Sequence, residues 1–145
     1  LTADKLGKFN ILEQDLRKLI QLKPDNAHAY NALGYSFAER GIQLPEALKL
    51  IKRAVELSPE DPYIIDSLGW VYYRMGNFVD GLNYLNIAFA ARPDPEIAAH
   101  LGEVLWVRGA KENAKDIWRS ALEKDPDNEV LLETVQRFIK NNVID

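Results

Sequence analysis

The chain has 145 residues, of which 47% are hydrophobic, and a formal net charge of −4 at pH 7. This length suits one domain, and the acidic balance, with no run of Lys and Arg between aromatic residues, argues against nucleic acid as a partner. No apolar stretch approaches the 18 residues of a membrane span, and without cysteine the chain holds no disulfide or thiolate metal site.

The first 26 residues read as an incomplete unit. Leu1–Leu6 has the pattern of the last turn of a helix, and Gly7 is predicted to interrupt it. Phe9–Leu22 is predicted to be a second helix without its first, and Pro24 marks a turn after it. The chain is therefore predicted to begin within a repeat and to be a fragment of a longer protein.

A two-helix unit then occurs three times, at residues 27–61, 62–94 and 95–128. In the middle copy, Leu68 and Tyr72 belong to an i, i+3, i+4, i+7 stripe on one face of a first helix. A second stripe follows, so each copy reads as helix–turn–helix. Residues 129–141 are predicted to form a closing helix with a polar outer side, as the end of a solenoid requires. Within 1–145 we predict one solenoid and no second domain.

Small residues recur at matched places in the three copies. Helix axes approach to roughly 8 Å only where the side chains at the crossing are small. We expect the glycines of the first helices to face the first small residue of each second helix, and a bulky replacement to overpack the contact. The positions are Gly34, Gly69 and Gly102 on the first helices, and Ala47, Gly81, Ala114, Ala54, Ala88 and Ala121 on the second.

These copies resemble the tetratricopeptide repeat family over nearly the whole chain. Each carries, at a period of about 34 residues, the small residues, a large apolar residue and a closing proline, which are Pro59, Pro93 and Pro126. The resemblance implies an all-α fold, a right-handed α–α superhelix of stacked helix pairs. It also implies that the first helices of the pairs line a concave groove.

Catalytic and metal-binding patterns are poorly represented. His28 and His100 have no cysteine or second histidine near them, and His100, with Glu103 three residues on, is interpreted as a packed or capped helix residue. No HExxH, GxSxG or phosphate-cradling glycine loop is present. We therefore predict that the chain is not an enzyme and holds no cofactor and no metal.

Aromatic residues gather on the groove side of the first helices when the copies are laid in register. Trp and Tyr are frequent at binding hot spots because they bury a large area with few rotatable bonds. For Trp70 and Trp106, packing in the core stays an open alternative, whereas Trp118 on a second helix is assigned to the core. The predicted partner-binding residues are Tyr35, Trp70, Tyr73, Arg74, Glu103 and Trp106.

One subclass of the resembled family is argued against. Members that clamp the acidic C-terminus of heat-shock chaperones use Lys and Asn on the groove helices, whereas here the corresponding places hold Asn31, Ala32, Tyr35, Asp66 and Ser67. Asp66 would repel a carboxylate. The expected partner is another protein, bound through an apolar peptide or an amphipathic helix.

A narrower resemblance concerns four segments: NALGYSFAER, DSLGWVYYRMG, RPDPEIAAHLGEVLW and ALEKDPDN. They are similar to the C-terminal repeats of proteobacterial tetratricopeptide lipoproteins on the inner side of the outer membrane, some of which bind a periplasmic carboxyl-terminal processing protease. This resemblance implies a non-catalytic adaptor for an envelope protease or assembly, located in the periplasm or at the outer membrane. Without the resemblance, a cytoplasmic location is expected. Two alternatives stay open: self-association through an uncapped N-terminal end, and a regulatory segment of a longer enzyme.

Overall fold

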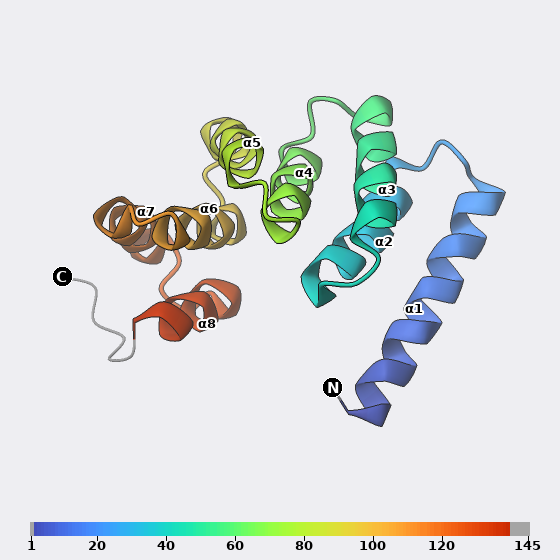
Figure 1. The fold of residues 1–145 in the computed structure, drawn as a ribbon, viewed down its shortest axis with the longest axis horizontal. Helices are drawn as coiled ribbons and strands as arrows, with labels where there is room; N and C mark the ends of the chain where they lie inside the picture. The colour runs from blue at the N-terminus through green and yellow to red at the C-terminus, as the bar shows by residue number, and fades with distance from the viewer. Residues whose placement is uncertain (1, 140–145) are drawn as a thin grey trace.

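The computed structural model describes residues 2–139, which form eight helices and no strand (Figure 1). The predicted all-α fold is therefore confirmed for this range. The helices are α1 (Ala3–Leu22), α2 (Ala27–Arg40), α3 (Leu44–Leu57), α4 (Pro62–Arg74), α5 (Phe78–Ala91), α6 (Pro95–Val107), α7 (Lys111–Lys124) and α8 (Glu129–Phe138).

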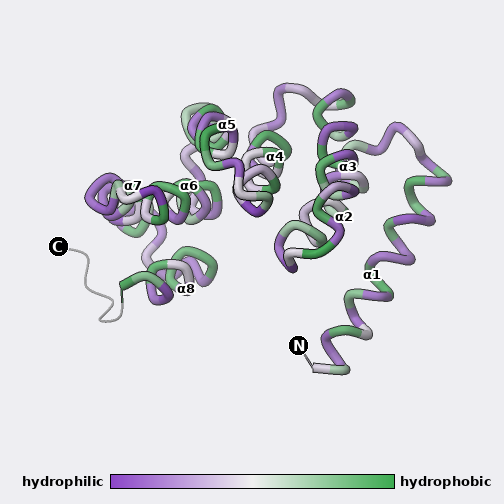
Figure 2. The backbone as a smooth tube through the Cα atoms, viewed as in Figure 1, coloured by the Kyte–Doolittle hydropathy of each residue, from purple (hydrophilic) through white to green (hydrophobic). Residues whose placement is uncertain are grey.

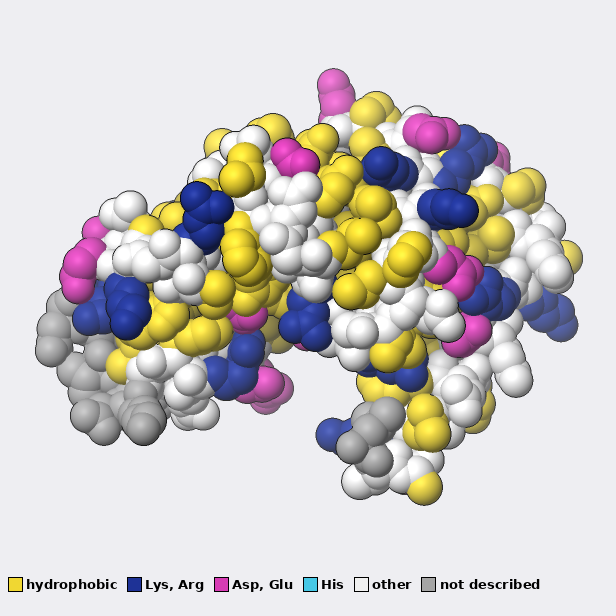
Figure 3. All heavy atoms as spheres, viewed as in Figure 1, with side chains coloured by type: hydrophobic (Ala, Val, Ile, Leu, Met, Phe, Trp, Pro, Cys, Tyr) yellow, Lys and Arg dark blue, Asp and Glu magenta, His cyan; other side chains and the backbone are white. Residues whose placement is uncertain are grey.

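The helices form a solenoid that curves into an arch. Consecutive helices pair as α2 with α3, α4 with α5 and α6 with α7, while α2, α4, α6 and α8 contact one another in series. The second helix of each pair lies on the outside of the curve, and α1 and α8 form its two ends (Figure 1). Figure 3, seen in the same direction, shows the surface hollowed between these ends.

Short polar side chains begin most of the helices. The side chains of Asn26, Asp61, Asp94 and Asn128 each accept a hydrogen bond from a backbone N–H in the first turn of α2, α4, α6 and α8. These are N-caps, which satisfy donors that have no partner within the helix. Asn or Asp thus recurs as the N-cap of α2, α4, α6 and α8, which we call the inner helices. These caps fix where each repeat begins.

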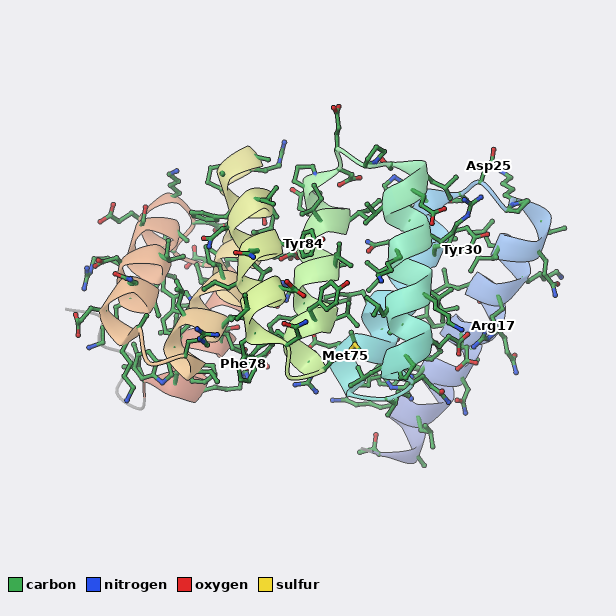
Figure 4. The ribbon with its side chains drawn as sticks, turned by 45° about the horizontal axis from the view of Figure 1, so that its top comes forward. Arg17, Asp25, Tyr30, Met75, Phe78 and Tyr84 are labelled. Carbon is green, nitrogen blue, oxygen red and sulfur yellow. The ribbon has the colours of Figure 1, made fainter. Side chains whose placement is uncertain are left out.

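The crossings within the pairs are as close as small residues permit. A Cβ atom built on Gly69 would lie 2.9 Å from the carbonyl oxygen of Gly81, and one on Gly34 would lie 3.0 Å from that of Ala47. At Gly102 the nearest atoms all belong to the indole of Trp118, which such a Cβ would overlap. The alanines that recur on the outer helices are buried, as are Trp118 and Leu85. Beside these crossings, Tyr84 of α5 stacks on Tyr72 of α4 with ring centroids 5.7 Å apart (Figure 4).

The N-terminal region corrects one prediction. Gly7 does not end a helix: Ala3–Leu22 is continuous, and Thr2 caps its start by accepting a hydrogen bond from the Lys5 N–H. A Cβ on Gly7 would meet nothing within 4 Å, so no tertiary contact demands a break there. Glycine inside a helix costs about 1 kcal/mol relative to alanine, which the flanking turns offset.

Helix α1 is attached to the solenoid more loosely than the others. It has no buried residue, and Ile11 is 60% exposed. Figure 2 shows that hydrophobic and hydrophilic residues alternate along α1. Arg17 makes a 3.0 Å ion pair with Glu46 of α3 (Figure 4), and the Arg40 guanidinium lies 4.2 Å from the centroid of the Phe9 ring. Exposed ion pairs contribute at most about 1 kcal/mol, so α1 is held weakly.

Amide hydrogen exchange should therefore be fastest in α1. Helices with few buried contacts open with small free energies, and the ends of solenoids contact one neighbour only. We expect amides of Ala3–Leu22 to exchange at least tenfold faster than those of Pro62–Arg74, measured by mass spectrometry on a sample shown to be monomeric by sedimentation. Equal protection of the two segments in a monomer would contradict this interpretation.

Helix α8 closes the other end, and residues 140 and 141 of the predicted closing helix lie outside the described range. Leu131 and Val135 are both buried on the apolar side of this helix. Glu133 and Gln136 are exposed on the polar side. Arg137 is also exposed but turns inward to reach Glu103 of α6, so the polar side of α8 takes part in the groove.

Candidate functional site

The concave side of the arch contains two adjoining hollows, which we call the inner groove. The first has a volume of about 360 Å³ and the second about 310 Å³, and Tyr35, His100 and Val130 line both. The first is further lined by Asn31, Ala32, Tyr63, Asp66, Ser67 and Glu96, and the second by Glu39, Trp70, Glu133, Thr134 and Arg137. Helices α2, α4, α6 and α8 thus all contribute to one surface.

His100 lies at the centre of the inner groove, held through both ring nitrogens. Its Nδ1 is 3.0 Å from each carboxylate oxygen of Asp66, and its Nε2 is 3.1 Å from the hydroxyl of Tyr35. That hydroxyl donates to Glu39 over 2.6 Å, so its single proton is already used and its oxygen must accept from His100. Both ring nitrogens therefore donate, which makes His100 an imidazolium. The indole of Trp70 stacks on it at a centroid distance of 4.1 Å.

The electrostatics of this chain of groups agree with the geometry. Burial by itself lowers the pKa of His100, but the charge of Asp66 and its hydrogen bond act in the opposite direction, and the pKa lies above its usual value. Burial and the hydrogen bond to Glu39 raise the pKa of the Tyr35 phenol. A histidine with no free lone pair is a poor general base, and a phenol with a raised pKa is a poor nucleophile. The arrangement therefore suits structural and binding roles better than catalysis.

A second polar chain crosses the groove beside the first. The Tyr73 hydroxyl donates to one carboxylate oxygen of Glu103 over 2.9 Å, and Arg137 donates to the other, also over 2.9 Å. Glu103 is only 4% exposed, and its partners come from α4 and α8. Burial and the charge of Glu103 raise the pKa of Tyr73. Together the two chains connect every inner helix from α2 to α8 through polar contacts.

The six residues predicted to bind a partner fall into different surroundings. Tyr35 and Trp70 line the groove, but Trp70 is only 3% exposed, and its indole N–H is buried without a partner among the described residues. Tyr73 and Glu103 are joined as described above. Arg74 is exposed and lines neither hollow; its Nε donates to the carbonyl oxygen of Ala38 over 3.0 Å.

Trp106 packs in a different apolar cluster from Trp70 and Tyr73. Its ring lies 5.7 Å from that of Trp118 and 6.0 Å from that of Phe138, within the apolar cluster of α6, α7 and α8. Trp70 and Tyr73 belong instead to the cluster of α2, α3 and α4. Trp106 is separated from these two residues because it packs against aromatic partners on α7 and α8.

Several groove residues were missed by sequence reasoning. His100 was interpreted as a packed or capped helix residue, and Arg137 as part of the polar outer side of the closing helix. The available signal was the pairing of opposite charges on successive first helices, about one repeat apart: Asp66 with His100, and Glu103 with Arg137. Repeat register places such residues next to each other, so the pairs were detectable.

Between residues 2 and 139, no three His, Cys, Asp or Glu side chains are grouped so that they would hold a metal ion. In the same range, none of the helices combines the length and the hydropathy needed to cross a bilayer.

Comparison with known proteins identifies the repeat. The model of the tetratricopeptide repeat family matches residues 2–62 and 67–129. A repeat-containing protein of this type from Pseudomonas aeruginosa is 48% identical over 103 residues, which are 71% of this chain and 18% of that protein. The chain thus spans less than a fifth of this relative.

Solved structures share the fold at lower identity. A thermophilic protein of the same repeat type from Thermus thermophilus superposes with a TM-score of 0.77 at 24% identity, covering 94% of this chain and 74% of the other. The first repeat domain of Spaghetti (RPAP3), solved bound to the HSP90 peptide SRMEEVD, superposes with a TM-score of 0.66 at 18% identity, covering 79% and 94%. At these identities the likeness concerns the fold alone.

Proposed function

The chain belongs to the tetratricopeptide repeat family, and from this premise we propose that its inner groove binds a segment of a partner protein. Such repeats generally serve as non-catalytic scaffolds for protein–protein interaction. The observation that supports the groove as the binding surface is its pair of adjoining hollows, lined by aromatic and charged side chains from four helices. Pockets that combine apolar walls with a few placed polar groups are typical binding sites.

The charges of the groove favour a neutral or basic segment over an acidic one. Asp66 and Glu96 line the first hollow, and Glu39 and Glu133 line the second. Of the described residues that line the second hollow, Arg137 is the one basic side chain apart from the shared His100. An acidic tail such as the peptide bound by the RPAP3 domain would meet like charges here, which costs affinity. We propose an extended peptide or an amphipathic helix as the occupant.

Photo-crosslinking within the full-length protein tests the groove. A benzoylphenylalanine at Ala32 or Glu133, both exposed residues that line the groove, should crosslink one and the same partner in the host cells. Matched controls at Asn83 and Ile87, exposed on α5, should not. The inner crosslinks should form again with the purified partner. An excess of the chain without the crosslinker should compete for that partner and reduce them. Crosslinks from α5 alone would place binding on the outer face and refute the proposal.

The sequence resemblance to outer-membrane-associated lipoproteins extends the proposal to an adaptor for an envelope protease or assembly. Fractionation of cells that carry the tagged full-length protein tests it: the extension requires the tag in the periplasmic or outer-membrane fraction. A tag found only in the cytoplasm would refute the extension and leave groove binding untouched.

Self-association is a second candidate, favoured by the open face of α1. Leu6, Ile11 and Leu12 are each more than 40% exposed, and Leu12 lines a further hollow of about 310 Å³ together with Phe9 and Arg40. Exposed apolar patches of this kind often mark contact surfaces. Sedimentation at increasing concentration should then show a dimer that Ile11→Glu abolishes, and a monomer at all concentrations would exclude this candidate.

A further inference from the structure

The first hollow of the inner groove has a lining that is unusual in its charge. Its acidic and histidine side chains are Asp66, Glu96 and His100, and no Lys or Arg is among its lining residues in the described part of the chain. His100 is cationic, and Asp66 binds it through both oxygens, so these two charges balance. The carboxylate of Glu96 on α6 is left without a counter-charge in the hollow.

The same hollow contains an acceptor that has no donor. The Oδ1 atom of Asn31 on α2 is buried and has no hydrogen-bond partner among the described residues. A buried polar atom left unpaired costs about 1–3 kcal/mol, and nearly all such atoms in folded proteins have partners. Because Asn31 lines the hollow, an N–H donor bound there would satisfy this atom once the Asn31 amide turned toward it.

Aromatic and small polar side chains complete the walls. Tyr35 and Tyr63 line the hollow from α2 and α4, and Ser67 of α4 lines it as well. The face of a tyrosine ring attracts a cation within about 6 Å. A volume of about 360 Å³ is at the lower end for ligand pockets, which suits one long side chain and not a large ligand.

We propose that this hollow is a specificity pocket for a lysine or arginine side chain of the bound partner segment. The charged group of that side chain pairs with Glu96 and donates to Asn31, while its methylene groups lie along Tyr35 and Tyr63. The inference rests on the proposed function, because it specifies one residue of the segment that the groove binds. It also explains why this hollow, among the described residues, is lined by neither Lys nor Arg, which an acidic peptide would need.

Blocked amino acids serve as probes for the pocket. N-acetyl-lysine methylamide and N-acetyl-arginine methylamide should shift the NMR signals of Asn31, Ser67 and Glu96 saturably, whereas N-acetyl-norleucine and N-acetyl-glutamate methylamides should not. Glu96→Gln should weaken binding by about threefold or more, and Asn31→Ala should weaken it as well. Glu60→Gln, which removes the same charge at an exposed position outside the pocket, should leave binding unchanged.

The outcomes separate this inference from the proposed function. Equal binding of norleucine and lysine probes, tighter binding of glutamate, or no shift at the pocket would each overturn the inference. If the inner crosslinks still identify a partner in that case, the groove function stands. Suppose that the lysine probe binds, and that Glu96→Gln weakens this binding, but that no partner crosslinks to the groove positions. The pocket then stands and the proposed function fails.

Discussion

Replacing His100 with leucine should lower the free energy of unfolding by about 3–5 kcal/mol. Asp66 is 6% exposed, and the variant would leave its carboxylate buried without a counter-charge. Tyr35 would also lose the donor at its oxygen, and Trp70 would lose its stacked ring. Urea unfolding followed by circular dichroism measures the effect.

Two matched variants give this prediction its control. His28→Leu, at an exposed histidine of α2, should change the free energy of unfolding by less than about 0.5 kcal/mol. The double variant Asp66→Leu/His100→Leu should recover much of the loss, because an apolar pair often replaces a buried ion pair at little cost. If His100→Leu is no less stable than His28→Leu, the His100 network does not hold the inner helices together.

The same network predicts a dependence on pH. Around His100 stand Tyr35 and Glu39 from α2, Asp66 from α4, Glu103 from α6, and Arg137 from α8, which pairs with Glu103. Because the folded pKa of His100 is raised, its contribution to stability is complete below the unfolded pKa of about 6.5 and is lost as the pH rises through the folded value. An NMR titration of the imidazole should therefore give a pKa above 6.5, and a value below it would contradict the imidazolium assignment.

The fold was predictable because its signals are local and repeated. Stripes such as Leu68 with Tyr72 set helix faces, and the recurrence at about 34 residues showed which helices pair. The break expected at Gly7 was wrong because that prediction relied on a local signal alone. A glycine at this repeat position ends a helix only if the chain turns there. In α1 no turn follows, and the helix continues.

The inner groove was predictable only in part, because its chemistry depends on contacts between repeats. Register placed Tyr35 and Trp70 on the correct side of the first helices, yet it did not reveal how deeply Trp70 is buried. The direction of Trp106 depends on Phe138, a residue of α8 that is 32 positions away. The protonation of His100 depends on the hydrogen bonds of Tyr35, which periodicity does not describe.

Gly69→Leu should destabilise the protein by about 1–3 kcal/mol or more, whereas Asn83→Leu should stay within about 0.5 kcal/mol. On an exposed helix, replacing glycine would stabilise by about 0.5–1 kcal/mol. At Gly69, however, a Cβ would lie 2.9 Å from the Gly81 carbonyl oxygen and 3.0 Å from the Leu85 backbone nitrogen. Backbone atoms cannot swing aside as a side chain can, so α4 and α5 must separate and the sign reverses.

Asn83 is the matched control because it receives the same leucine side chain but is exposed. It lies on α5, the helix that α4 crosses at Gly69. Thermal unfolding of the two variants, followed by the helical signal, should show a large fall in Tm for Gly69→Leu and little change for Asn83→Leu. Gly69→Ala, which adds the Cβ alone, should fall between them, because the gain in helix propensity offsets part of the clash. Equal shifts for the two leucine variants would mean that α4 and α5 do not cross at Gly69, and the register of every repeat would then need revision.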